Sequence, residues 1–377
     1  MKRPTTRLTV AAVAAMLAIP AGHLATQAMA ETPPQYAVDP FWPKPLPDSW
    51  ILGQVAGIAV DGDDNVWIVH RPSSLVDDEK GAQQSPPATR CCIAAPSVLQ
   101  FSGDGKLLRS WGGPGAGYEW PENEHGIHID KEGSVWLAGN AKNDHQILKF
   151  TPDGKFLQQI GKAGSTGGSN SKTQLGRPAH MVTDDAAGEI YVADGYLNRR
   201  IIVLDSKTGD YKRHWGAYGT KEATDEKLPA YKPVAITQLS KSFSNPVHCV
   251  RLARDGLVYV CDRANDRIQV FQKDGTFVKE FQVEAQTLQN GSVWDLVLSE
   301  DAGQRYIFVA DGANMAIMTL DRQSGQKLAS FGRPGRMAGE FKWVHNMAID
   351  SKGNLYTSEV GHGRRAQKFK RVSGAAN

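Results

Sequence analysis

The chain has 377 residues, of which 43 are basic and 40 are acidic, so its formal net charge is only +3. Three of the basic residues lie within the first seven positions, and the remaining sequence is balanced in charge. A nucleic-acid-binding protein or a protein that binds anionic membranes needs a surplus of Lys and Arg, so we expect neither activity.

The first thirty residues have the pattern of a secretory signal. Lys2, Arg3 and Arg7 precede an apolar run over residues 8–20, and small residues precede a cleavage position after Ala30. No later segment approaches the roughly 20 apolar residues that a membrane helix needs. The sequence therefore predicts a signal peptide over residues 1–30, a single domain over 31–377, a periplasmic or secreted location, a monomer, and no membrane span.

The rest of the chain repeats a pattern of short strands. An alternating apolar strand is followed by a polar turn with Gly and by a second strand that contains an aromatic residue. Hairpin signals such as Asp104-Gly105 and Asp274-Gly275 introduce third and fourth strands. The first strands are expected at residues 57–61, 126–130, 180–184, 249–252, 295–298 and 346–350. Six such units without helical periodicity predict an all-β fold, a six-bladed β-propeller.

The two ends of the repeat region complement each other. The sixth unit stops after its third strand, near residues 367–370, whereas a strand pattern around Tyr36 precedes the first unit. We expect the N-terminal strand to close the ring and so to remove two open edges. Four longer segments, 72–96, 112–124, 163–178 and 220–246, are expected to be loops.

Four cysteines in an exported chain are compatible with disulfides. Cys249 and Cys261 lie on neighbouring strands of one unit, which favours a bond between them. Cys91 and Cys92 are adjacent and are then either bonded to each other or free. No CxxC spacing occurs, which disfavours a thiolate metal site.

One His recurs at the same position of alternate units. His125, His248 and His345 stand eleven residues before the aromatic residue of the second strand, in units two, four and six. The first strand of a blade lines the central channel, so these side chains are expected to converge at spacings of about 120°. Three neutral imidazoles with an open fourth position form a typical catalytic zinc site. The alternative is a channel lined by unrelated polar residues, and His180, which shares the spacing, weakens the symmetry.

A second group of polar residues lies near the ends of the second strands. Arg71 and Arg263 follow the aromatic residue by four positions in units one and four, and Tyr196 lies one position further along in unit three. Because Arg binds carboxylates with two parallel hydrogen bonds, this group suits an anionic substrate. The alternative is that Arg263 is solvated or paired with Asp262 or Asp266.

Several motifs together form a specific set: Gly53-Gln54-Val55, His70-Arg71, His125-Gly126-Ile127, Asp194-Gly195-Tyr196, Asp262-Arg263 and Val344-His345. This set resembles the NHL-repeat propeller of the peptidyl-α-hydroxyglycine α-amidating lyase family. The resemblance implies zinc on His125, His248 and His345, with Tyr196 and Arg71 at the reacting carbon and Arg263 assisting. The implied reaction cleaves an α-hydroxyglycine carbinolamide into an amide and glyoxylate, and the expected substrate is a small-molecule or peptide-derived carboxylate.

The chain departs from the family around the last His. Trp343-Val344-His345-Asn346 stands where the family has Met-Pro-His-Asp, so an indole replaces a thioether and an amide replaces the carboxylate that holds calcium. A calcium site is therefore doubtful. Two other functions remain open: a non-catalytic NHL propeller that binds protein or glycan partners through its loops, and a lactone or ester hydrolase, which would need metal-binding carboxylates that are scarce here.

Overall fold

The structure, a computed structural model, describes residue 1 and residues 32–224 and 240–373. Chain contacts divide it into residues 1–32 and 33–377, and the propeller lies in the second unit. Apart from Met1, the predicted signal peptide over residues 1–30 lies outside the described residues, as does most of the 220–246 loop. Among the helices that the structure describes, none is long and apolar enough to cross a membrane.

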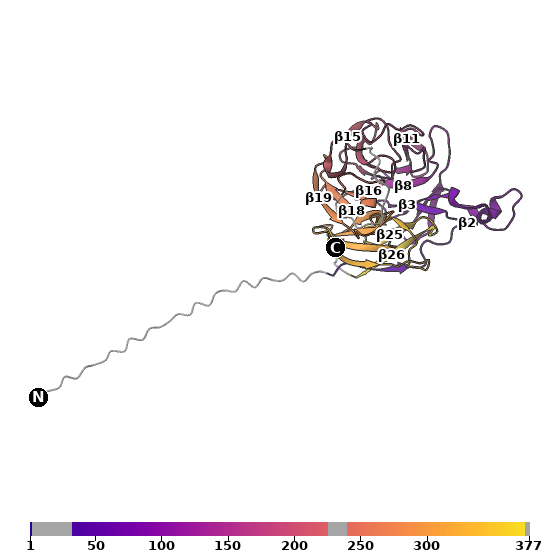
Figure 1. Cartoon of the computed structure of the whole chain (residues 1–377). Coiled ribbons are helices and arrows are strands. Elements are labelled where there is room, and N and C mark those ends of the chain that lie inside the picture. The colour runs from indigo at the N-terminus through magenta and orange to yellow at the C-terminus, as the bar shows by residue number, and fades with distance from the viewer. Residues whose placement is uncertain (2–31, 225–239, 374–377) are drawn as a thin grey trace. The chain divides into compact units, whose positions relative to one another are not determined.

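Six four-stranded antiparallel sheets form the blades (Figure 1), which confirms the predicted all-β six-bladed propeller. In order from the channel outward, the strands are β3 (Gln54–Val60), β4 (Val66–Arg71), β6 (Val98–Phe101) and β7 (Leu107–Trp111) in the first blade; β8 (Glu124–Ile129), β9 (Val135–Gly139), β10 (Gln146–Phe150) and β11 (Phe156–Gly161) in the second; β12 (His180–Asp184), β13 (Glu189–Asp194), β14 (Arg200–Asp205) and β15 (Tyr211–Trp215) in the third; β16 (Val247–Leu252), β17 (Val258–Asp262), β18 (Arg267–Phe271) and β19 (Phe277–Gln282) in the fourth; β20 (Asp295–Leu298), β21 (Tyr306–Asp311), β22 (Ala316–Asp321) and β23 (Lys327–Phe331) in the fifth; and β24 (Val344–Ile349), β25 (Leu355–Glu359), β26 (Arg365–Ser373) and β1 (Gln35–Asp39) in the sixth.

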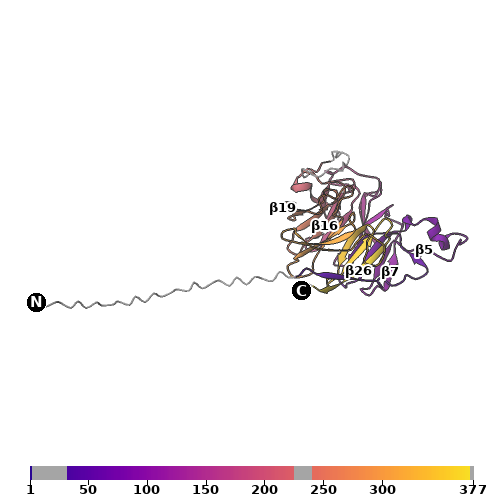
Figure 2. The same ribbon diagram turned by 60° about the horizontal axis from the view of Figure 1, so that its bottom comes forward.

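The N-terminal strand closes the ring as predicted. β1 pairs antiparallel with β26 (Figure 2). In this pairing Val38 lies opposite Phe369. The ring of Tyr36 packs edge-on against Phe308 of the fifth blade, with 5.5 Å between centroids. The pairing covers the outer edge of β26, which would otherwise expose unpaired backbone groups.

In two repeats the aromatic residue of the second strand links the local turn to the core. The indole N–H of Trp67 donates to Asp61 at 2.8 Å, and that of Trp136 donates to Asp130 at 3.0 Å. Both carboxylates also accept backbone N–H groups of the turn, so one Asp fixes the turn and the ring together. Each of these rings then belongs to an apolar cluster with residues of the next blade.

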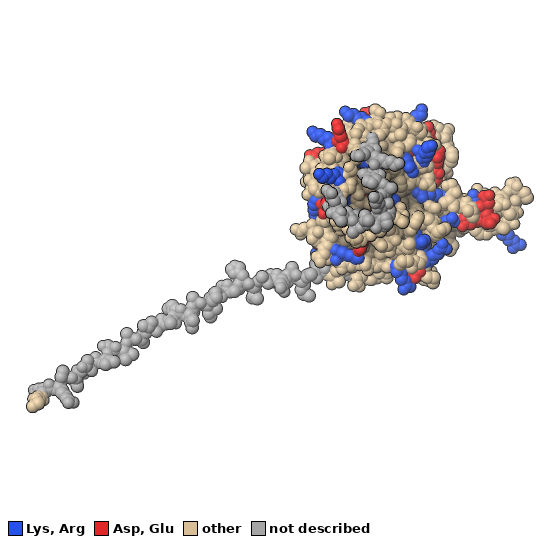
Figure 3. All heavy atoms as spheres, in the orientation of Figure 1, with Lys and Arg blue, Asp and Glu red and all other residues tan. Residues whose placement is uncertain are grey.

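An arm interrupts the first blade over the segment 72–96 that we expected to be a loop. It contains η1 (Pro72–Ser74), η2 (Asp77–Gln83) and β5 (Ile93–Ala94), and β5 pairs in parallel with β2 (Trp50–Ile51). Figure 3 shows acidic side chains gathered on this arm, where η2 carries Asp77, Asp78 and Glu79. Arg364 of the sixth blade binds both oxygens of Glu79 and so ties the arm to the ring.

The cysteines form two disulfides. Cys249 is bonded to Cys261, whose strands β16 and β17 place the two residues opposite each other. Cys91 is bonded to Cys92 within the arm. The structure thus confirms the favoured Cys249–Cys261 pairing and decides the open question for Cys91 and Cys92.

Candidate metal centre

Each of the three predicted ligands sits in an irregularity at the start of an inner strand. The pairing of β8 with β9 shifts register between Glu124 and Ile127, on either side of His125. The same kind of shift surrounds His248 in β16 and His345 in β24. A bulge changes the direction of the side chain it carries. His180 pairs regularly with Ala193, which explains why its equal spacing does not bring it into the group.

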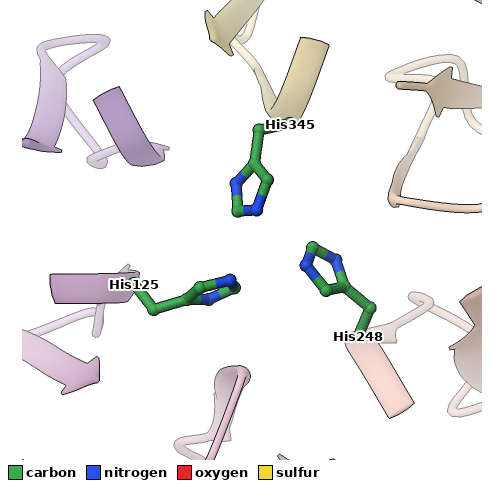
Figure 4. A group of neighbouring side chains, drawn as sticks. All are labelled: His125, His248 and His345. Carbon is green, nitrogen blue, oxygen red and sulfur yellow. The ribbon is translucent and has the colours of Figure 1, made fainter. Parts of the chain in front are cut away.

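The three imidazoles point towards one another on the propeller axis (Figure 4). One nitrogen from each ring lies within 4.8 Å of the other two, and the ring centroids are 4.7, 4.8 and 5.0 Å apart. His125 and His248 are fully buried, and His345 is 2% exposed. The structure thus brings together the three residues that the sequence selected.

Backbone carbonyls hold each imidazole in one tautomer. Nδ1 of His125 donates to the carbonyl of Ala179 at 2.7 Å, and Nδ1 of His345 donates to that of Ala56 at 2.6 Å. Nδ1 of His248 donates to the carbonyl of Trp294. A carbonyl can only accept, so Nδ1 carries the hydrogen and Nε2 keeps a lone pair. Outer-shell hydrogen bonds of this kind orient metal-binding His residues.

The surroundings keep all three rings neutral. Burial lowers the pKa of His125 and His248 well below the usual value. The charge of Arg263 acts in the same direction on both, and that of Arg71 on His125. Burial and Arg71 lower the pKa of His345 to about 3. Neutral imidazole is the form that binds a metal.

The donor set fits zinc. It supplies three converging nitrogen ligands, the number and type that a catalytic zinc site takes from the protein. Calcium needs oxygen ligands instead. Next to His345, the amide of Asn346 donates to Asp295 at 3.0 Å, and the same carboxylate binds Arg251 at 2.6 Å.

Tyr196 covers the gap between two of the imidazoles. Its hydroxyl lies 2.9 Å from Nε2 of His125, 3.1 Å from Nε2 of His248 and 3.4 Å from the guanidinium of Arg263. Tyr196 follows β13 in the third blade, and the two rings belong to the second and fourth blades. The hydroxyl is therefore placed to exchange a proton with a group bound on the axis.

The Asp-Gly-Tyr motif builds the loop that holds Tyr196. Asp194 accepts hydrogen bonds from the backbone of Gly176 at 2.7 Å and from Arg200 at 2.9 Å, and this ion pair is fully buried. A Cβ at Gly195 would lie 2.0 Å from the carbonyl oxygen of Val247, the residue before His248. Only glycine allows this approach, so the motif joins the tyrosine loop to the fourth blade.

The two arginines face the site, and neither has a carboxylate partner among the residues that the structure describes. Arg71 donates from Nε to the carbonyl of Glu124 at 2.7 Å and from its terminal nitrogen to Gln54 at 2.8 Å. Nε of Arg263 is buried without a hydrogen-bond partner in the described structure. Asp262 binds Arg267 at 2.7 Å, and Arg263 forms no ion pair with a carboxylate of the described residues, so the alternative pairing with Asp262 or Asp266 is wrong.

Sequence reasoning missed two side chains at the site. Trp294 precedes β20 and contacts the rings of His248 and His345, with centroids 6.1 and 5.7 Å away. Glu124 directly precedes His125, is 5% exposed, and accepts from Ser97 at 2.9 Å. Burial raises the pKa of this carboxyl. The sequence offers one indication of both residues: each stands at the start of an inner strand or directly before it.

Fold and site together define a six-bladed β-propeller of NHL-type repeats with three histidines on its axis. No family model matches the chain. The chain is 28% identical over 295 residues to NHL repeat-containing protein 3 of Mus musculus, which covers 73% of this chain and 72% of that protein. It is 26% identical over 336 residues to peptidyl-α-hydroxyglycine α-amidating lyase 1 of Drosophila melanogaster, which covers 82% of this chain and 56% of that protein. These relatives confirm the resemblance seen in the motifs.

A solved structure supports the fold alone. A protein of unknown function from Bacteroides thetaiotaomicron matches with a TM-score of 0.50 and 15% identity, over 85% of this chain and 70% of that one.

Proposed function

We propose that this protein is a zinc-dependent lyase that cleaves an α-hydroxyglycine carbinolamide, R–CO–NH–CH(OH)–COO⁻, into the amide R–CO–NH₂ and glyoxylate. The observation that carries the proposal is the hydroxyl of Tyr196, which touches Nε2 of His125 and His248 and the guanidinium of Arg263. The similarity to an α-amidating lyase over 82% of this chain supports the reaction class.

The charges of the site favour an anionic substrate. Arg71 and Arg263 are 8% and 9% exposed, and neither forms an ion pair with a carboxylate of the described residues. A guanidinium stays charged in a protein, and a buried charge is costly unless an opposite charge compensates it. The carboxylate of the substrate would supply this charge. Arg71 would bind it, with its own orientation fixed by Glu124 and Gln54.

The reaction needs one proton transfer in each direction. Zinc held by His125, His248 and His345 would act as a Lewis acid that makes the α-hydroxyl of the substrate more acidic. The hydroxyl of Tyr196 would take the proton of the α-hydroxyl and give its own proton to the amide nitrogen, while the freed electron pair forms the carbonyl of glyoxylate and the C–N bond breaks. Arg263, 3.4 Å from the same hydroxyl, would hold Tyr196 in place for this transfer. No water or oxidant is consumed.

We also propose that residues 1–30 direct export and that residues 31–377 act as one monomeric domain in the periplasm or outside the cell. Disulfides persist in such oxidising compartments, and the propeller contains two.

The test is release of glyoxylate from α-hydroxyhippurate, in which R is phenyl, by zinc-loaded protein. The wild type should release glyoxylate, and Tyr196→Phe should lose about 10²- to 10⁴-fold in rate while it keeps its zinc. Tyr211→Phe is a matched control, because Tyr211 also bonds a His ring, at 2.9 Å, but on the outer strand β15. A wild type that binds one zinc and releases no glyoxylate would contradict the proposal.

The second candidate is a propeller that binds a protein or glycan partner without chemistry. NHL repeat-containing protein 3, matched over 72% of its length, is named for its repeat and not for a reaction, and so keeps this candidate open. Metal content separates the two candidates. About one zinc per chain supports the lyase, and no zinc after incubation with the metal supports the binding module.

A further inference from the structure

One side of the histidine cluster is apolar. The ring of Trp294 covers the gap between His248 and His345 and is 3% exposed. Its indole N–H donates to the carbonyl of Gly291 at 2.8 Å, so it offers no free donor to a substrate. Trp294 forms a small buried apolar cluster with two further side chains, Ala56 and Val360.

Trp343 extends this apolar side to the surface. Its ring lies 6.0 Å from that of Trp294, it is 38% exposed, and it stands two residues before His345. Its φ of +58° lies in the left-handed region, which bulky residues rarely adopt. Conformations of this kind persist where the surroundings enforce them, and they gather at functional sites. The indole is held in this way although more than a third of it is exposed, which points to a role in binding.

The remaining residues around the cluster are polar and are used by the proposed reaction. Tyr196 covers the gap between His125 and His248, and Arg71 donates to the carbonyl of Glu124, the residue before His125. The guanidinium of Arg263 lies 4.6 Å from the ring centroid of Trp294 and occupies one of its faces. The apolar side of the cluster is therefore the one that runs from Trp294 to Trp343.

We propose that Trp294 and Trp343 form an aromatic subsite, and that Trp343 selects substrates whose acyl group R carries a flat ring next to the carbinolamide. The substrate class is then an N-aroyl α-hydroxyglycine, or a peptide with an aromatic residue before the α-hydroxyglycine. The ring of R stacks in an offset or edge-on manner on the exposed indole. This inference rests on the proposed lyase function, since it names the substrate of the same site.

The experiment measures binding, so that it does not depend on turnover. Hippurate and N-acetylglycine lack the α-hydroxyl and cannot react, and they differ only in phenyl against methyl. Isothermal titration calorimetry on zinc-loaded wild type should show hippurate binding about tenfold more tightly. Trp343→Ala should bring the two affinities within about twofold of each other, and Trp343→Phe should give an intermediate ratio. Phe41→Ala removes another exposed aromatic ring, one that is 75% exposed, and should keep the wild-type ratio.

The outcomes separate this inference from the lyase proposal. Equal affinities in the wild type, or a tenfold ratio that survives in Trp343→Ala, would overturn the aromatic subsite. Selective binding of hippurate without any glyoxylate from α-hydroxyhippurate would contradict the lyase and leave the subsite standing. Equal turnover of the benzoyl and acetyl α-hydroxyglycines would contradict the subsite alone. A thermal melt of each variant confirms that it is folded.

Discussion

His345→Ala and His180→Ala form a matched pair that tests the metal centre. Both residues stand at the same distance before an aromatic residue, and they are 2% and 1% exposed. Only His345 belongs to the group of three converging nitrogens. Replacement by Ala removes the same atoms from the same depth of the channel in both variants. The two variants therefore differ in the metal site and share the cost of a buried substitution.

The expected magnitudes follow from these contacts. Either substitution should lower the free energy of unfolding by about 1–3 kcal/mol, as is usual for a buried residue. Loss of an outer-shell partner alone costs about 10- to 100-fold in metal affinity, and loss of the ligand His345 should cost more. After dialysis against chelator-free buffer, plasma mass spectrometry should find about one zinc per chain in wild type and in His180→Ala, and almost none in His345→Ala.

Two results would refute this reasoning. One zinc retained by His345→Ala would show that the metal binds elsewhere. Equal loss of zinc from both variants would show that damage to the channel, and not loss of a ligand, releases the metal. Denaturant unfolding of the same samples gives the stability against which the two metal contents are compared.

Three further predictions concern binding, pH and ring closure. Arg71→Lys should keep zinc and raise the KM for the carboxylate substrate by about tenfold, because Lys cannot form two parallel hydrogen bonds; an unchanged KM would remove Arg71 from the binding role. Burial lowers the pKa of His70 to about 4, whereas an unfolded imidazole titrates near 6.5. Below pH ~6.5 the unfolded His70 binds a proton that the folded His70 excludes, so this residue should lower the free energy of unfolding by up to about 3 kcal/mol towards pH 4. Other buried His residues such as His128 act in the same direction, so His70→Gln should reduce the pH dependence by this amount in denaturant titrations without removing it. Deletion of residues 33–39 removes β1 and exposes the edge of β26, so light scattering should show association that full-length protein lacks; a deletion variant that stays monomeric would contradict this role.

The repeat made most of the fold predictable. The aromatic residue follows the first strand at a similar spacing in each unit, and in the first blade this spacing allows the hydrogen bond from Trp67 to Asp61. The number of blades can therefore be read from the sequence. The repeat pattern also shows that the sixth unit lacks a fourth strand. Together with the strand pattern near Tyr36, this predicted that β1 closes the ring. The internal structure of the arm was not predictable, because its parallel pairing of β2 with β5 joins two short segments without a periodic pattern.

The residues of the site were predictable where the type of the side chain itself indicates its chemical role. His125, His248 and His345 share a position that the repeat makes visible. Their orientation depends on bulges and on carbonyls of other blades, such as that of Ala179, and a backbone carbonyl leaves no signature in residue type. Trp294 was missed because a tryptophan beside a first strand is typical of packing between blades, and only its contact with His248 reveals its place.

Closure of the ring also determines when, during folding, the three imidazoles can come together. Tyr36 pairs with Arg371, so β1, the first strand that the structure describes, can pair only after β26, the last one, has been made. Pairing between such distant segments is slow and comes late in folding. The three imidazoles come from blades spread along the same length, and they meet only when the ring is complete. A chain that crosses a membrane unfolded would therefore acquire its ion after transport, and the metals available in the receiving compartment would decide which ion it carries.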